Sequence, residues 1–320
     1  MGAAAEAGII DTRSQPPTVH WRGVTHSTAP DFIDVELHMT VCREAGLTHV
    51  MLHQAMITTI MNEVAGTKTI DAARGHNDYM AEIRAKYPEM VLPYGLVRPH
   101  DGILAVEEAR RCIEELEFKA LAVDTSYGTT NREFIHTVEA WDFWEYVDHM
   151  RIPVCIHPAM LCYGWEWMTC YKFDETVARP AETALTVSYM IVTGLLDRFP
   201  NLQLILAPMG GAFPMCLPRL EFAHRLGWQG FPPFQIAQNK HSPSHYVRRN
   251  LWADTMGFDP AGIRHAIELF GIDRVLLGTD YGPVPISPKE HIDIVRNELS
   301  LSGEEQEMIL GRNAARLFGI

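Results

Sequence analysis

The sequence predicts an α/β protein, and within that class a distorted (β/α)8 TIM barrel. Short apolar runs rich in β-branched residues recur at eight places along the 320 residues, and helical patterns separate most of them. Each run is continuously apolar rather than alternating, which is typical of parallel strands buried on both faces. An open doubly wound sheet is the alternative, but no GxGxxG or GxxxxGK loop follows an early strand. We therefore expect one barrel domain spanning residues 1–320.

The expected elements follow directly from these runs. The strands are predicted at Ala7–Asp11, Thr48–His53, Val91–Val97, Ala120–Asp124, Pro153–His157, Leu202–Pro208, Leu251–Asp254 and Val275–Asp280. The helices are predicted at Asp34–Ala45, Asn77–Tyr87, Leu104–Leu116, Phe134–His149, Pro180–Arg198 and Pro260–Leu269, with a further helix after Gly211.

The charge balance excludes several classes of partner. Forty acidic residues against 27 Lys and Arg give a formal net charge of −13, whereas nucleic acids and anionic membranes are bound by basic surfaces. A composition with 47% hydrophobic and 21% charged residues is that of a folded globular chain. We expect a small-molecule partner and neither nucleic acid nor membrane.

Targeting signals and disulfide patterns are also missing from the sequence. No run approaches 18 apolar residues, and the N-terminal MGAAAEAGIID does not resemble a signal peptide. The six cysteines stand at 42, 112, 155, 162, 170 and 216 without a CxxC pair, as expected for reduced, mostly buried thiols. These features predict a cytoplasmic protein.

Polar side chains stand where most of the predicted strands end, which is where a TIM barrel carries its active site. In chain order they are Asp11, Arg13 and Gln15; His53 and Gln54; Arg98 and His100; Asp124; His157; Asp254; and Asp280 with Tyr281. Pro208 ends the sixth strand. The pattern predicts a catalytic mouth, although solvated strand ends can look the same.

Four stretches carry a resemblance to a known family. They are PVCIHPAM (153–160), RPAETALTVSYMIVTGLLDRFPNLQLILAPMGGAFP (179–214), NLWADTMGF (250–258) and DRVLLGTDYG (273–282). With the C-terminal GRNAARLFGI, the chain resembles the amidohydrolase superfamily, in its aminocarboxymuconate semialdehyde decarboxylase-like branch. The resemblance implies a distorted TIM barrel, usually one zinc-type metal, and decarboxylation, hydration or hydrolysis of small, often carboxylated substrates. It also implies a possible homodimer, in line with the segment TGLLDRFP (193–200).

The family's metal site consists of an HxH pair after strand 1, a His after strand 5 and an Asp after strand 8, and a His after strand 6 acts as acid/base. His157 and Asp280 match two of these positions, whereas Arg13, Gln15 and Pro208 replace the others. A guanidinium has no lone pair for a metal, and Gln15 is a poor zinc ligand. We therefore expect no cofactor and no catalytic metal. His20, His53 or Asp254 could instead complete a relocated metal site with His157 and Asp280.

Three residues are the predicted catalytic group. Asp280 follows an apolar strand and is expected to act as general acid/base or to activate water, with an ion pair to Arg13 as the alternative. His157 could transfer a proton or bind substrate, or it could be a remnant of an ancestral metal site. Arg13 could hold a substrate carboxylate in a bidentate pair, or it could simply replace the charge of the lost metal.

Further residues are predicted to bind substrate with less support. Gln15 could orient a substrate oxygen, and His20, His53 and Tyr281 stand in strand-end loops. Trp165 and Trp167, with Tyr163, crowd the segment CYGWEWMTCY after the fifth strand. Such a cluster could form a lid or an apolar wall for an aromatic substrate, or it could be an interface or ordinary loop packing.

Four functions remain open on this evidence. The first is a metal-independent decarboxylase-like lyase acting on a small unsaturated or hydroxyaromatic carboxylic acid, with Asp280 or His157 supplying the proton and Arg13 placing the carboxylate. The second is a metal-free hydrolase of the lactonase type, in which Asp280 activates water. The third is a cyclase, isomerase or dehydratase, and the fourth is a binding barrel without catalysis.

Overall fold

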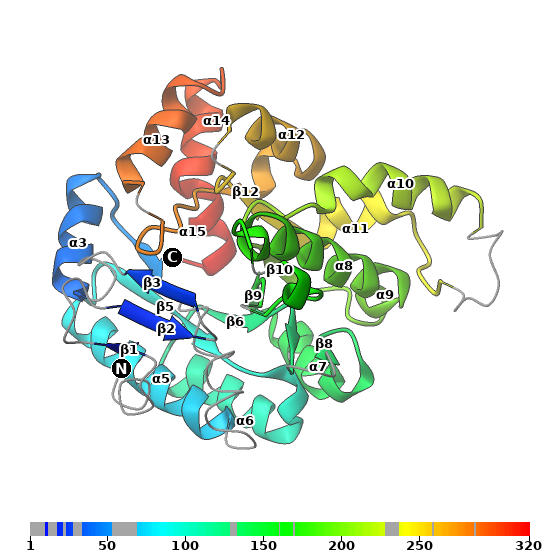
Figure 1. Ribbon diagram of the computed structural model, residues 1–320, viewed down its shortest axis with the longest axis horizontal. Coiled ribbons are helices and arrows are strands. Elements are labelled where there is room, and N and C mark those ends of the chain that lie inside the picture. Colours follow the sequence, from blue (N-terminus) through cyan, green and yellow to red (C-terminus); the bar gives the residue numbers. More distant parts are fainter. Residues whose placement is uncertain are drawn as a thin grey trace.

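The computed structural model shows seven parallel strands in one curled sheet, surrounded by helices (Figure 1). It describes residues 10–11, 18–21, 24–27, 34–52, 69–128, 133–159, 161–168, 170–227, 237–257, 259–284 and 286–320. The strands of this sheet are β4 (Val50–Leu52), β5 (Val91–Leu96), β6 (Ala120–Asp124), β9 (Pro153–His157), β10 (Gln203–Leu206), β11 (Leu251–Asp254) and β12 (Val275–Leu276). They neighbour one another in chain order, so the fold is a distorted TIM barrel as predicted.

Helices connect these strands in the expected alternation. They are α3 (Val35–Glu44), α5 (Thr69–Lys86), α6 (Ile103–Arg110), α7 (Trp141–Met150), α8 (Arg179–Val192), α9 (Leu195–Arg198), α10 (Phe213–Arg225), α11 (Pro243–Asn250), α12 (Pro260–Phe270), α13 (Pro288–Asn297), α14 (Gly303–Glu307) and α15 (Asn313–Phe318). Several start signals are local. Asp34 caps α3 by accepting from two backbone N–H groups, and Ser287 with Glu290 forms a capping box at α13. No helix in the described ranges is long and apolar enough to cross a bilayer.

The apolar residues form two clusters on the two faces of the sheet. The larger cluster fills the space between the strands and the helices, and Trp144, Phe143, Phe213 and Phe270 are fully buried in it. The smaller lies on the inner face and includes Tyr94, Cys155 and Trp252, with Phe318 of α15 packed edge-on against Tyr94. Burying each large side chain contributes roughly 1.5–3 kcal/mol. Polar side chains, which are not part of the inner cluster, stand at the carboxyl ends of several strands.

The structure corrects several predicted elements. Of the expected first barrel strand, the described residues Ile10–Asp11 (β1) pair antiparallel with β2 (Thr18–Trp21), which pairs with β3 (Val24–Ser27) in a separate sheet. Phe134 belongs to β8 (Glu133–Phe134), which forms a hairpin with β7 (Ser126–Tyr127), so the helix predicted from Phe134 begins only at Trp141.

Other differences concern where elements begin and end. The helix predicted over Pro180–Arg198 is broken at Gly194, whose φ of 74° is left-handed. The last strand ends at Leu276 rather than Asp280, and α5 begins eight residues before Asn77. Four of the six cysteines are buried, as expected for structural thiols.

Candidate active site

The carboxyl edge of the sheet gathers four titratable side chains. Asp124, His157 and Asp254 are the last residues of β6, β9 and β11, and Asp280 follows four residues after β12. Asp124 and His157 are direct partners in the register of their strands. Side chains alternate along a strand, so these residues share the inner face with Ala122, Cys155 and Trp252, which lie in the inner apolar cluster. The carboxyl edge of the sheet is therefore polar, and the inner face next to it is apolar.

Asp254 is the most buried carboxyl group with a shifted pKa at this edge. Its side chain is 8% exposed, and Oδ1 accepts hydrogen bonds from the backbone N–H of Met209 (2.6 Å) and of Met256 (3.0 Å). Burial raises the pKa of Asp254 to about 6, although the two backbone donors oppose the shift. A Cβ atom at Gly278 would lie 2.7 Å from Cβ of Asp254. Only glycine therefore allows the segment after β12 to lie this close to Asp254.

The second carboxyl group at this edge is Asp280, and the charge of Asp254 acts on it. The pKa of Asp280 is raised to about 6, first by burial and then by the charge of Asp254, while Arg179 at the start of α8 acts to lower it. The Asp280 side chain is nevertheless exposed at the strand end, where solvent screens such effects. Asp280 adopts a left-handed φ of 46°, which is uncommon outside glycine and turns the chain sharply at this position.

His157 has a defined ring orientation. Its Nδ1 forms a 2.8 Å hydrogen bond with the carbonyl oxygen of Pro158, so Nδ1 carries the proton in the neutral ring and Nε2 is the basic nitrogen. The side chain is half-buried. A histidine held in this way can donate or accept a proton through Nε2 at the mouth of the barrel.

The residues of the predicted aromatic wall differ in their burial. Trp165 is half-buried in a single 3-10 turn, η5 (Trp165–Trp167), whereas Trp167 is 83% exposed and Tyr163 is also exposed. Tyr281 is half-buried and packs against His38 of α3, with the ring centroids 4.8 Å apart. Its contact with α3 gives Tyr281 a packing role in addition to the predicted one.

Several predicted site residues lie outside the described parts of the chain. Arg13, Gln15 and His53 fall outside the described residues, so their place in the site stays a prediction. His20 lies on β2, where its backbone pairs with Thr25. The proposed ion pair between Arg13 and Asp280 is likewise untested.

The sequence analysis missed two residues that act on this edge. Arg179 is the cation that acts on Asp280 within the described part of the chain, and Glu182, one turn further along α8, is buried beneath the loops. Both belong to the segment RPAE, which was read only as a family motif. Their spacing of three residues on one helix face was the available signal.

The donor set does not fit the metal site implied by the family. Within the described residues, no three His, Cys, Asp or Glu side chains are grouped so that they could hold a metal ion. His157 and Asp280 are present, but the sequence has Arg13 and Gln15 where the family has its paired histidines. Two donors in the described part of the chain do not make the three or four ligands that a catalytic ion requires.

The family model for amidohydrolases matches residues 39–320. The chain belongs to the amidohydrolase family. Gamma-resorcylate decarboxylase from Polaromonas sp. strain JS666 is 30% identical over 79% of this chain and 77% of its own length. The 2-amino-3-carboxymuconate-6-semialdehyde decarboxylase of Dictyostelium discoideum is 27% identical over 78% of this chain and 67% of its own. The predicted family and branch are therefore confirmed.

A solved structure agrees with this relationship. Dihydroxybenzoic acid decarboxylase from Polaromonas sp. JS666, determined with bound manganese and the inhibitor 2-nitroresorcinol, superimposes with a TM-score of 0.77. It is 25% identical, and the match covers 88% of this chain and 85% of that one. These relatives support an enzyme of the lyase type.

Proposed function

We propose that this protein is a carboxy-lyase that releases CO2 from a small hydroxyaromatic or unsaturated carboxylic acid by acid/base catalysis. The observation that carries the proposal is the grouping of Asp254, Asp280 and His157 at the carboxyl edge of the barrel, where burial raises carboxyl pKa values to about 6. Such a site retains a protonated carboxyl group close to neutral pH. The decarboxylase relatives support the choice of reaction.

The reaction needs a proton donor and a holder for the carboxylate. The donor adds a proton to the ring carbon that bears the carboxylate. The bond between that carbon and the carboxyl carbon then breaks, its electron pair returns to the ring, and CO2 leaves. Asp280 or His157 would supply the proton. Arg179 or Arg13 would hold the carboxylate through charge-assisted hydrogen bonds.

We further propose that the reaction proceeds without a metal ion at the family position. The support is the donor set, in which Arg13 and Gln15 stand where paired histidines would be needed. A guanidinium can perform one task of a cation, because it neutralises a carboxylate and stabilises developing negative charge. It cannot activate a bound water, which disfavours metal-type hydrolysis.

The test combines product analysis with control of the metal content. The purified protein is incubated with 2,6-dihydroxybenzoate, 5-carboxyvanillate and related acids in ²H₂O and in H₂¹⁸O, after chelation and with added Mn²⁺. We expect CO2, deuterium at the former carboxyl-bearing carbon, no ¹⁸O in the organic product, and the same rate in both metal conditions. Ring opening with ¹⁸O incorporation would replace the proposal by the hydrolase. Activity that depends on Mn²⁺ would overturn the metal-free site while leaving the lyase.

A further inference from the structure

Glu182 on α8 is a buried carboxylate whose hydrogen-bond donors come from the ends of two barrel strands. The side chain is 1% exposed. Its Oε1 accepts from the hydroxyls of Thr125 (2.5 Å) and Ser126 (2.8 Å), which directly follow β6. Its Oε2 accepts from the backbone N–H of Tyr163, in the loop after β9. A buried carboxylate requires such donors, because burial without them is costly.

Thr125 extends this arrangement to the segment that carries His157. The Thr125 hydroxyl, while donating to Glu182, accepts from the backbone N–H of Ala159 at 3.0 Å. The Thr125 backbone N–H donates to the carbonyl oxygen of His157 at 2.9 Å. The backbone on both sides of Pro158 is thereby fixed to the end of β6, and Pro158 carries the carbonyl that orients the His157 ring.

The Tyr163 contact fixes the aromatic loop, which we define as residues 161–168. Within this loop, turns are closed by Trp165 N–H to the carbonyl of Cys162 (3.0 Å) and Trp167 N–H to that of Gly164 (3.1 Å). Glu182 holds the loop at Tyr163, inside the first of these turns. One carboxylate therefore connects the loop with the strand end beside it.

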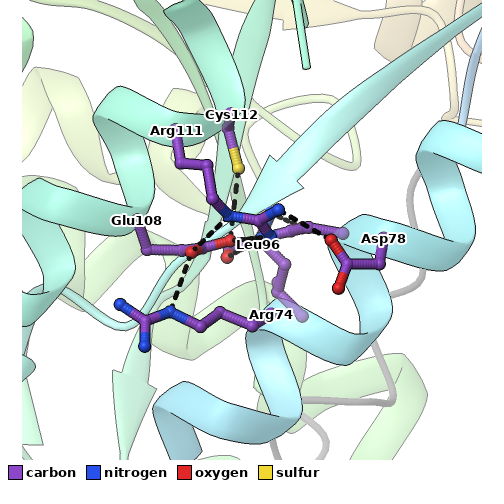
Figure 2. A network of polar contacts seen from close by, with 7 residues as sticks. Arg74, Asp78, Leu96, Glu108, Arg111 and Cys112 are labelled. Carbon is purple, nitrogen blue, oxygen red and sulfur yellow. Dashed lines mark hydrogen bonds and ion pairs between the residues drawn. The ribbon is translucent and has the colours of Figure 1, made fainter. Parts of the chain in front are cut away.

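A second buried glutamate shows what a purely structural network looks like. Glu108 on α6 is 0% exposed and is bound by Arg74, Asn77 and Arg111, with the Cys112 thiol nearby (Figure 2). Its donors lie on α5 and on η3 (Arg111–Glu115), which follows α6, and Asn77 also binds the backbone of Leu96, the last residue of β5. The donors to Glu182 instead come from the segments that follow β6 and β9.

We propose that Glu182 is a positioning residue that fixes the His157 segment and the aromatic loop relative to each other, and so sets both the proton transfer and the shape of the substrate site. The consequence for catalysis rests on the proposed function. The positioning itself does not, because the hydrogen bonds that it predicts can be measured in the absence of substrate.

The primary test is amide hydrogen exchange in the wild type, Glu182→Met, Glu182→Gln and the control Glu108→Gln. Methionine has a similar length and removes both acceptors. We expect Glu182→Met to speed exchange at Ala159 and within 161–168 by at least about tenfold relative to the rest of the barrel. Glutamine should restore most of the protection, because its oxygen can accept from Tyr163 while the two hydroxyls rotate to accept from its amide. Glu108→Gln should change exchange in α5, in α6 and at the backbone N–H of Leu96, and should leave Ala159 and residues 161–168 unchanged.

Kinetics then separate positioning from stability. Glu182→Met should lower kcat/KM by about 10–100-fold with a change in kcat, whereas folded Glu108→Gln keeps both constants. Uniform exchange changes, or unchanged exchange at 161–168, would overturn the positioning role. If Glu182→Met does not fold, Thr125→Val carries the test, with faster exchange expected at Ala159. A wild type without CO2 release but with these exchange changes would refute the function and leave the positioning intact.

Discussion

Replacing Asp254 by Asn tests the electrostatics of the site through protein stability. Burial raises the pKa of Asp254 from 3.8 to about 6. The folded protein thus binds this proton more tightly than the unfolded chain. The resulting cost of ionisation is absent below pH 3.8, grows as the pH rises, and is complete above pH 6. About two pH units at 1.36 kcal/mol each give a cost of about 3 kcal/mol.

Asparagine should remove this cost while keeping the local structure. Both backbone donors, from Met209 and Met256, bind the same oxygen of Asp254, and the amide oxygen of asparagine can accept both. The new amide N–H₂ group must find acceptors beside Gly278, which costs about 1 kcal/mol. We expect Asp254→Asn to be more stable than the wild type by about 2 kcal/mol at pH 8.

The assay is urea denaturation of both proteins between pH 5 and pH 8. About half of the ionisation cost is already present at pH 5, so the stability difference should grow by about 1.5 kcal/mol from pH 5 to pH 8. A difference that stays flat with pH, or that shrinks towards pH 8, would refute a buried carboxylate with a raised pKa.

Four further outcomes follow from the same geometry. Asp280→Asn should lower turnover by at least about 100-fold with little change in stability, and unchanged turnover would exclude acid/base roles for this carboxyl group. Because a proton donor must be protonated, wild-type kcat should fall as the pH rises through about 6, and Asp254→Asn should move this limb to lower pH by removing the neighbouring charge. Gly278→Ala should lower the free energy of unfolding by about 1–3 kcal/mol, because its Cβ would lie 2.7 Å from that of Asp254, whereas Gly303→Ala, with no atom within 4 Å, should be neutral or stabilising in the same melts. Trp167→Ala should change stability by less than about 0.5 kcal/mol, since the side chain is 83% exposed, and a raised KM would place it at the substrate.

The strands were the most predictable part of the fold. Ala120–Asp124, Pro153–His157 and Leu251–Asp254 have the predicted bounds, because central parallel strands are buried on both faces and so are written as continuous apolar runs. The last strand was predicted four residues too long. Its apolar run continues to Leu277, yet Gly278 approaches Asp254 closely and Asp280 adopts a left-handed φ, and neither is visible in a hydropathy pattern.

The residues of the candidate site were likewise predictable only in part. Family-matched positions predicted His157 and Asp280, and the replacement of the paired histidines by Arg13 and Gln15 stays a prediction because both residues lie outside the described ranges. Asp254 was predicted only as a polar group at a strand end and as a possible metal ligand. Its hydrogen bonds with the backbone N–H groups of Met209 and Met256 are not visible in the sequence, because they depend on how the strand ends pack.

The sequence by itself determined the barrel, the family and the chemical types of residue available at the strand ends, since these depend on local patterning and on motif identity. Only the tertiary structure decided which of these groups act on one another. The charge of Arg179 reaches Asp280, and Glu182 reaches Thr125 and Tyr163, across separations of about 20 to about 100 residues along the chain. Such electrostatic and hydrogen-bonded pairings depend on distance in space, and that distance is set by how the strands and helices pack.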